Sequence, residues 1–280
     1  MIQKLDCHMH IWRLQRGDYD WLTPDLGEIY RDFEIDNVWT EAKAGGVTHV
    51  ILVQAAASVA ETDFLLSVAD SDRRVHGVVG WVDFEADDAA EQIALRAKTP
   101  HLLGLRPMIA DLPNLQWILR DECKPALEAV QASGLIFDAH AHPDLVPVMT
   151  RLAADYPQLP IVLNHAGKPP IASAELGVWR RDIAALARHE NVCCKLSGLL
   201  TEAGTRTDDA AIGEIVEHVA ACFGPERLLW GSDWPVLTLA GNYKAWVEQC
   251  ERIVGQFFPD HADAIFSGNA KRIYSRKPGV

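Results

Sequence analysis

Apolar and polar residues follow two periods along this chain, and the two periods alternate in tandem. Short runs rich in β-branched residues each precede a longer segment in which apolar residues recur at spacings of three and four, as in a helix with one buried face. This alternation of strands and helices is typical of a parallel sheet. The eight predicted strands lie at Lys4–Trp12, Thr48–Gln54, Val75–Asp83, Leu102–Ile109, Leu135–His142, Pro160–Gly167, Asn191–Gly198 and Arg227–Pro235. The clearest predicted helices lie at Glu61–Asp70, Ala86–Ala97, Pro143–Tyr156, Glu175–His189 and Asp208–Phe223.

Eight strand–helix units in tandem predict an α/β fold, a single closed (β/α)8 TIM barrel. An open doubly wound sheet would usually carry a glycine-rich dinucleotide-binding loop after its first strand, and none follows Lys4–Trp12. Because neither a linker nor a break in composition divides the chain, we expect one domain over residues 1–280. The long segment at about Leu14–Val38 is rich in aromatic and acidic residues, and it could either cover the barrel mouth or be an ordinary surface excursion.

Charge and cysteine content narrow the class of protein. The formal net charge is −13, which repels phosphate backbones and anionic membranes, so we expect neither nucleic acid nor a membrane as a partner. The amino terminus lacks an apolar export signal, and no apolar run reaches the length of a membrane span, so we expect a soluble, cytoplasmic protein. Six scattered cysteines without Cys-x-x-Cys spacing predict reduced thiols, with neither disulfides nor structural zinc.

Two histidines mark the end of the first predicted strand. Side chains alternate along a strand, so Asp6, His8, His10 and Trp12 are expected on one face. Both imidazoles could then meet at the carboxyl end of the strand, in a geometry that suits either metal ligation or the polarisation of a carbonyl group. The His-x-His spacing alone is a weak signal, because packed histidines also produce it.

Two other predicted strands run from apolar residues directly into groups that can do chemistry. The eighth reaches Asp233, and the sixth reaches His165, where their apolar runs break into loops. Active sites of barrels are assembled from the carboxyl ends of the strands, so both residues belong at the catalytic face. Asp233 is the best candidate for a general base, although a cap of the following turn is its alternative role.

The fifth predicted strand aligns Asp138, His140 and His142 on one face. Of these three residues, His142 lies at the very end of the strand. We therefore expect His142 to line the pocket, and we assign Asp138 and His140 to supporting or structural roles.

The fourth and seventh predicted strands add charged and hydroxyl groups. Arg106 precedes a strand-ending proline, and its guanidinium could bind a carbonyl, hydroxyl or carboxylate of a substrate or form a salt bridge across the barrel rim. The seventh strand offers either Lys195 or Ser197 to the pocket, and the sequence leaves that choice open.

Several short motifs occur in a fixed order along the chain. They are Asp6-x-His-x-His-x-Trp12, Tyr19-Asp-Trp-Leu22, Asn164-His-Ala-Gly-Lys-Pro169, Cys194-Lys-Leu-Ser-Gly198, Gly231-Ser-Asp-Trp-Pro235 and the tail Ile265–Tyr274. Together they resemble the amidohydrolase superfamily, in its branch of sugar lactonases and 2-pyrone-4,6-dicarboxylate lactonases, and they are most similar in kind to the L-fucono- and L-rhamnono-lactonases. The resemblance extends from the first strand to within a few residues of the carboxyl terminus. It implies a barrel hydrolase of carboxylic ester bonds in carbohydrate catabolism.

The resemblance also implies roles for individual residues. His8 and His10 match the family's first-strand pair, His165 its sixth-strand histidine and Asp233 its eighth-strand carboxylate. Metal-dependent members of the superfamily use these groups as ligands, so the same four residues would hold an ion, such as a single adventitious zinc, if one binds. Arg106 stands where a bridging ligand would be, and its permanent charge argues against a two-metal site. Since the lactonase branch includes metal-free enzymes, we expect no required cofactor.

These expectations combine into hydrolysis of a sugar lactone of the L-fucono-, L-rhamnono- or L-galactono-lactone type to its aldonic acid. Asp233 would take a proton from water, while His8, His10, His165 and Arg106 hold the lactone carbonyl and stabilise the developing oxyanion. The alternatives are a mononuclear metal-dependent hydrolase or a non-oxidative decarboxylase of the same superfamily, and a sugar-binding barrel without catalysis.

The expected partner is a small-molecule sugar lactone. We expect Arg106, His142, Trp21 and Trp234 to bind it, with the two tryptophans as aromatic walls for the apolar face of a sugar ring. A dicarboxylated pyrone would need two carboxylate clamps, and Arg106 supplies one, which favours a neutral sugar. The particular lactone and the oligomeric state stay open.

Overall fold

The computed structural model of the protein describes residues 2–275 and contains one sheet of eight parallel strands, ordered β1 to β8 as in the sequence. The strands are β1 (Lys4–Met9), β2 (Val47–Val53), β3 (Val75–Gly80), β4 (Leu102–Leu105), β5 (Ile136–Ala139), β6 (Ile161–Leu163), β7 (Val192–Leu196) and β8 (Leu228–Trp230). Each begins close to its predicted start. All eight end earlier than predicted, because the last residues of the predicted segments belong to loops at the carboxyl ends of the strands.

Backbone hydrogen bonds close the sheet where β1 meets the segment that follows β8. The N–H of Asp233 donates to the carbonyl of His8 over 2.8 Å, and the N–H of His10 donates to the carbonyl of Trp234 over 2.7 Å. Met9 and Trp234 form a parallel bridge at the same place. The predicted α/β barrel is therefore confirmed.

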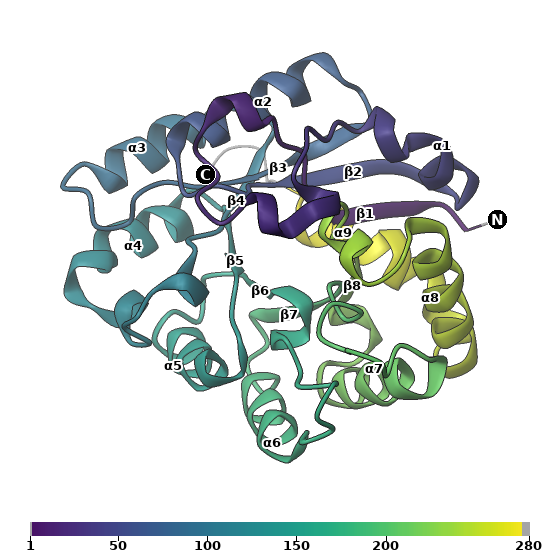
Figure 1. Cartoon of the computed structure of the whole chain (residues 1–280). Helices are drawn as coiled ribbons and strands as arrows, with labels where there is room; N and C mark the ends of the chain where they lie inside the picture. Colours follow the sequence, from purple (N-terminus) through teal and green to yellow (C-terminus); the bar gives the residue numbers. More distant parts are fainter. Residues whose placement is uncertain (1, 276–280) are drawn as a thin grey trace.

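Helices separate the strands and surround the sheet (Figure 1). They are α1 (Asp36–Ala44), α2 (Val59–Ser71), α3 (Ala89–Arg96), α4 (Lys124–Ala132), α5 (Val146–Asp155), α6 (Gly177–Leu186), α7 (Asp209–Phe223), α8 (Tyr243–Phe257) and α9 (Asn269–Ile273). Asp208 caps α7 by accepting hydrogen bonds from the N–H groups of Ala210 and Ala211. Among the described residues, no helix has the length and apolar character needed to cross a membrane.

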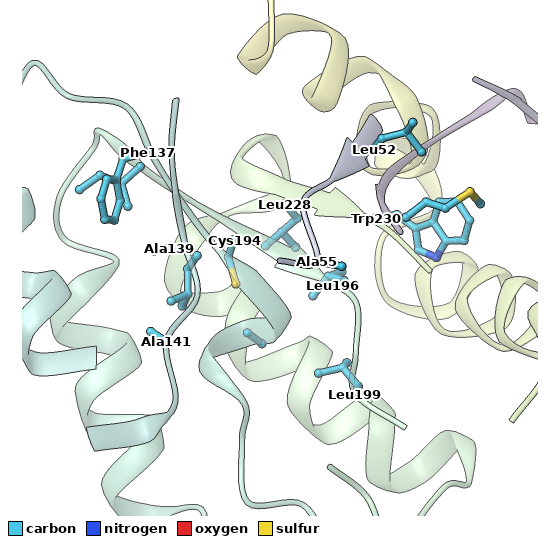
Figure 2. Close-up of a cluster of buried hydrophobic side chains, with 14 of the residues drawn as sticks. Leu52, Ala55, Phe137, Ala139, Ala141, Cys194, Leu196, Leu199, Leu228 and Trp230 are labelled. Atoms are coloured by element: carbon cyan, nitrogen blue, oxygen red, sulfur yellow. The ribbon is translucent and has the colours of Figure 1, made fainter. Parts of the chain in front are cut away.

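Two hydrophobic cores lie on the two sides of the sheet, because strand side chains point alternately inward and outward. The outer core packs the strands against the helices, and Figure 2 shows part of it, including Leu52 of β2, Phe137 of β5 and Trp230 of β8. The inner core fills the barrel with residues of the strands and of α9. Its members are Leu5, Cys7, Ile51, Val53, Val79, Leu103, Ile136, Val162, Leu229, Ala270 and Tyr274.

A bulge in β1 changes the alternation just before the first histidine. From Asp6 to Met9, β1 advances three residues while its paired strand β2 advances two. Asp6 therefore faces the helices, where it accepts a hydrogen bond of 2.8 Å from the Tyr243 hydroxyl of α8, whereas His8 faces the barrel interior. The expectation that Asp6 shares a face with His8 is wrong, because strict alternation does not allow for the extra residue.

The segment between β1 and α1 covers the carboxyl ends of the strands. Two short 3-10 helices lie in it, at Leu14–Arg16 and Pro24–Ile29. The indole of Trp21 donates to the carbonyl of Ala55, after β2, over 2.6 Å. The ring of Phe33 packs against Trp234, after β8, at a centroid distance of 5.2 Å. These contacts favour the interpretation of this segment as a cover over the barrel mouth.

Glu61 of α2 anchors the cover. Its carboxyl group accepts hydrogen bonds from the Tyr19 hydroxyl over 2.7 Å and from the Ala55 N–H over 3.1 Å, and the Arg16 guanidinium lies 3.4 Å away. The side chain is fully buried, and burial raises the pKa of Glu61 to about 7. The folded protein therefore favours the uncharged form of Glu61 below that pH.

The raised pKa of Glu61 predicts a pH-dependent contribution to stability. Its folded value of about 7 exceeds the ordinary 4.5, so the contribution is present below pH 4.5 and is lost as pH rises to 7. Glutamine mimics the neutral acid and does not titrate. The free energy of unfolding of Glu61→Gln should therefore increase relative to that of the wild type as pH rises through this window, by up to about 3 kcal/mol. Urea unfolding at several pH values measures the difference. Glu248→Gln at an exposed position of α8 is the control, and a pH-independent difference for Glu61→Gln would contradict the prediction.

Candidate active site

Four predicted residues converge at the carboxyl end of the barrel: His8, His10, His165 and Asp233. One carboxylate oxygen of Asp233, Oδ1, lies 3.3 Å from His10 Nε2, 3.6 Å from His8 Nε2 and 3.9 Å from His165 Nε2. The Nε2 atoms of His8 and His10 are 3.2 Å apart. Each of the four side chains is at most 7% exposed. The site is thus a nearly closed cluster of three imidazoles around one carboxylate.

Backbone turns after β6 and β8 position two of these residues. β6 ends at Leu163, and a φ of +52° at His165 places this residue in the left-handed region that non-glycine residues rarely adopt. Asp233 has a φ of +61°, and its N–H bond to the His8 carbonyl holds it there. Such conformations concentrate at functional sites. The predicted strand Pro160–Gly167 is too long because its second half forms this turn.

Burial sets the protonation of the cluster. It lowers the pKa of His8 well below its ordinary value, lowers that of His10, and brings that of His165 to about 4. Burial alone would raise the pKa of Asp233, but the interactions with His165 and His10 outweigh it and hold this pKa below its ordinary value. At neutral pH the cluster is therefore three neutral imidazoles around an ionised carboxylate that can accept a proton.

Hydrogen bonds at the Nδ1 atoms assign the tautomers of two histidines. His10 Nδ1 donates to the Val53 carbonyl over 2.7 Å, since a carbonyl can only accept, and this leaves a lone pair on His10 Nε2. His8 Nδ1 lies 3.3 Å from the ammonium of Lys195, which has only hydrogens to offer. Neutral His8 therefore carries its hydrogen on Nε2 and donates it to His10 Nε2. His8 presents an N–H donor to the site, and His10 presents an acceptor.

Both candidate residues of β7 face the barrel interior. Lys195 Nζ lies 2.9 Å from each oxygen of Asp138, and Ser197 Oγ lies 3.0 Å from His165 Nδ1. Because Lys195 and Ser197 are two positions apart, both side chains point to the same side, and alternation does not separate them. The Lys195–Asp138 ion pair lies beneath the histidine cluster and supports it through His8.

Arg106 follows β4 and brings a buried guanidinium to the site. Its Nη2 donates to the Gln54 carbonyl, and the Gln54 amide donates to the Arg106 carbonyl over 2.6 Å. Arg106 Nε and Gln54 Oε1 are both buried and have no hydrogen-bond partner among the described residues. Because buried polar atoms without partners are rare and unfavourable, both atoms are candidates for contact with a ligand.

Two residues outside the predicted catalytic set also reach the site. His140 Nδ1 is buried without a partner in the described part of the chain, and its alternation with Asp138 along β5 was the signal for its inward direction. Lys168, in the motif that follows β6, has a φ of +51°, and its Nζ lies 3.4 Å from Glu202 Oε1. Burial, together with the positive charges of Arg106 and Lys168, holds the pKa of His140 well below its ordinary value. His142 is half-buried, and its role in lining the pocket stays a prediction.

The two tryptophans expected to bind substrate have different surroundings. Trp21 is 38% exposed and is held by its hydrogen bond to Ala55, so part of its ring is open at the barrel mouth. Trp234 is 4% exposed and belongs to the outer core, where it packs against Phe33. Trp21 therefore has surface available for a ligand, and Trp234 has little.

The cluster matches a zinc site in one respect and differs from it in another. Tetrahedral zinc holds its ligand atoms about 3.3 Å apart, close to the separations of 3.2–3.9 Å among these Nε2 and Oδ1 atoms. His10 has the tautomer of a ligand, with Nδ1–H bound to a carbonyl and Nε2 free. His8 has the opposite tautomer, because Lys195 occupies its Nδ1. The donor atoms fit zinc in spacing but not in the placement of hydrogen.

An α/β barrel with a His-x-His pair, a third histidine and an aspartate at its strand ends defines a class of barrel hydrolases. The family described as Amidohydrolase matches residues 5–276, and the chain belongs to this family. An L-fucono-1,5-lactonase of Burkholderia ambifaria is 41% identical over 98% of this chain and 96% of its own length. Another L-fucono-1,5-lactonase, of Burkholderia multivorans, is 33% identical over 97% of this chain and 96% of its own length. A crystal structure of a Burkholderia multivorans amidohydrolase with bound Zn, 31% identical, has a TM-score of 0.90 and covers 97% of this chain and 99% of its own.

Gly198, after β7, tests the geometry of the cluster. It has a φ of +60°, and a Cβ atom there would overlap His165 Nδ1 and lie 3.1 Å from Asp233 Oδ2. Gly198→Ala should therefore displace the imidazole and lower hydrolytic kcat/KM about 100-fold. The control is Gly134→Ala, which has a φ of +64° with open space around the added Cβ, and which should lose about 1 kcal/mol of stability while it keeps its activity. Equal kinetic losses in both variants would contradict the assignment.

Proposed function

We propose that the protein hydrolyses a sugar lactone of the L-fucono-1,5-lactone type to its aldonic acid, with Asp233 as the general base. The proposal is carried by a buried, ionised carboxylate that faces three imidazole Nε2 atoms at 3.3–3.9 Å, one of which, on His8, is an N–H donor. Ester hydrolysis needs a base for the attacking water and a donor for the carbonyl oxygen. Two L-fucono-1,5-lactonases that are similar over nearly their whole length support this substrate class.

The cluster can support both steps of lactone opening. Asp233 accepts a proton from a water molecule whose oxygen attacks the carbonyl carbon, and the carbonyl oxygen becomes an oxyanion. The His8 N–H, which donates to His10 Nε2 in the structure, donates to that oxygen instead, with His165 and Arg106 beside it. The ring C–O bond then breaks, and protonated Asp233 returns its proton to the leaving ring oxygen. The aldonic acid ionises after it leaves the site.

We propose further that this reaction requires no metal. A lactone expels an alkoxide, a better leaving group than an amide nitrogen, so the need for a Lewis acid is smaller. Arg106 already supplies a buried positive charge near Asp233, and in the assigned tautomer the Nε2 atom through which His8 would bind zinc carries a hydrogen. Zinc in the related Burkholderia multivorans structure supports a single-ion alternative, in which His8, His10, His165 and Asp233 would hold the ion and the ion would polarise the carbonyl.

The surroundings of the cluster favour an uncharged, polyhydroxylated ring as substrate. Lys168 Nζ lies 3.4 Å from Glu202 Oε1, which matches its charge, so Arg106 is the remaining cation near the cluster among the described residues and can bind one carbonyl or hydroxyl. A dicarboxylate would need a second free cation. The unpartnered atoms of Arg106 and His140 can bind hydroxyl groups, and the exposed face of Trp21 can pack against the apolar face of a sugar ring.

Asp233→Asn tests the general base. The amide cannot accept the proton from water, so kcat/KM for L-fucono-1,5-lactone should fall about 10²- to 10⁴-fold while the fold is retained. Acid release in a pH-stat measures the rate, and circular dichroism checks the fold. Asp144→Asn, at an exposed position after β5, is the control and should keep wild-type activity.

Other results of the same assay would contradict the proposal. Full activity of Asp233→Asn would exclude the carboxylate as the base. Evolution of CO2 from an aromatic acid, with no acid release from any aldonolactone, would indicate a decarboxylase. Binding of the lactone without turnover would indicate a sugar-binding barrel.

A further inference from the structure

Lys195 is buried at the centre of the barrel, one layer below the histidine cluster. Its side chain and that of Asp138 are both 0% exposed, and Nζ lies 2.9 Å from each carboxylate oxygen. The third hydrogen of the ammonium points to His8 Nδ1 at 3.3 Å. All three hydrogens of Lys195 therefore have acceptors, and one of these acceptors is a residue of the active site.

The Asp138 carboxylate is the counter-ion of the Lys195 ammonium. Besides the ammonium, the carboxylate accepts hydrogen bonds from the Tyr274 hydroxyl and the Asn164 amide, so every group around it is a donor. A carboxylate surrounded by donors is an acceptor only, and its positive partner must be the lysine. Burial of such a pair usually contributes little net stability, and apolar residues of similar size would often serve as well. Because the pair lies under His8, its ammonium can donate a hydrogen bond to His8 Nδ1, which apolar residues could not do.

We propose that Lys195 is a positioning residue that fixes the tautomer of His8. Because an ammonium cannot accept a hydrogen bond, it keeps hydrogen off His8 Nδ1 and places it on Nε2, the atom that faces the substrate. A chain of hydrogen bonds with one direction follows, from Lys195 through His8 and His10 to the Val53 carbonyl. This inference rests on the proposed function only for the use that the reaction makes of the His8 donor.

The same contact opposes zinc. A histidine that binds zinc through Nε2 carries its hydrogen on Nδ1, and that hydrogen would point at the hydrogens of the Lys195 ammonium. The positive charge of Lys195 also repels a cation. Removal of the ammonium should therefore weaken catalysis and strengthen zinc binding at the same four side chains, a combination that simple loss of structure would not produce.

Three variants separate this role from a structural one. Lys195→Met removes the ammonium, and the double variant Asp138→Asn with Lys195→Met removes both charges, so that no carboxylate is left buried without a partner. Lys195→Arg keeps a cationic donor and should restore part of the wild-type behaviour. The matched control is Lys4→Met, because Lys4 is also 0% exposed and bonds to a carboxylate, that of Glu251 at 2.6 Å, but stands at the start of β1, whereas His8 is near the end of that strand.

Three readouts follow the variants. Nitrogen-15 NMR of labelled histidine should show His8 as the Nε2–H tautomer in the wild type and in Lys4→Met, and a shift towards Nδ1–H in the two methionine variants of Lys195. In those variants kcat should fall about 100-fold with KM nearly unchanged, since an oxyanion donor acts in the transition state. Zinc affinity, measured by competition with a chelator, should rise about 10- to 100-fold.

The wild-type spectrum alone can overturn the proposal, so it does not depend on the folding of a variant. An Nδ1–H tautomer of His8 in the wild type would do so. Folded Lys195→Met with unchanged kcat and unchanged zinc affinity would also do so. The NMR and zinc measurements need no substrate, and therefore a wild type that hydrolyses no lactone would refute the proposed function while these two readouts still decide the role of Lys195.

Discussion

The candidate active site depends on how the barrel is closed. Two backbone hydrogen bonds join β1 to the segment after β8, and they involve His8, His10 and Asp233 themselves. Three of the four residues of the cluster therefore supply backbone atoms that complete the sheet. The bulge in β1 adds the one residue that turns His8 inward, so that it meets His10 and Asp233. Because the hydrogen bonds that close the barrel involve these residues, the rigid fold also holds their side chains in place.

Electrostatics explains why a cluster of buried polar groups is useful here. Burial keeps the three histidines neutral, and this leaves Asp233 as an ionised base with no strong acid beside it. The Lys195–Asp138 pair lies one layer deeper and controls the hydrogen on His8. A hydrogen that is fixed on His8 Nε2 before the reaction needs no proton shift when negative charge develops on the carbonyl oxygen. The role of the buried Lys195–Asp138 pair is thus to orient the hydrogen on His8 rather than to stabilise the fold.

The sequence predicts the barrel and four residues of the cluster because both follow from strong local patterns. Apolar runs set the strands, and His8, His10, His165 and Asp233 stand where such runs break. The direction of Asp6 could not be predicted, because a single-residue bulge leaves no mark in the periodicity. The left-handed turn at His165 could not be predicted either, because its imidazole contacts Ser197, a residue distant in the sequence.

Metal dependence distinguishes the proposed mechanism from its zinc-dependent alternative. The donor atoms have the spacing of a zinc site, but the hydrogen that Lys195 places on His8 Nε2 is on the atom through which His8 would bind the ion. The most direct measurement is kcat for L-fucono-1,5-lactone as a function of zinc content, determined by elemental analysis of the same samples. An unchanged kcat in protein stripped of zinc is the predicted result. Activity that falls in proportion to zinc content, and that returns when zinc is added, would contradict a metal-free general-base mechanism.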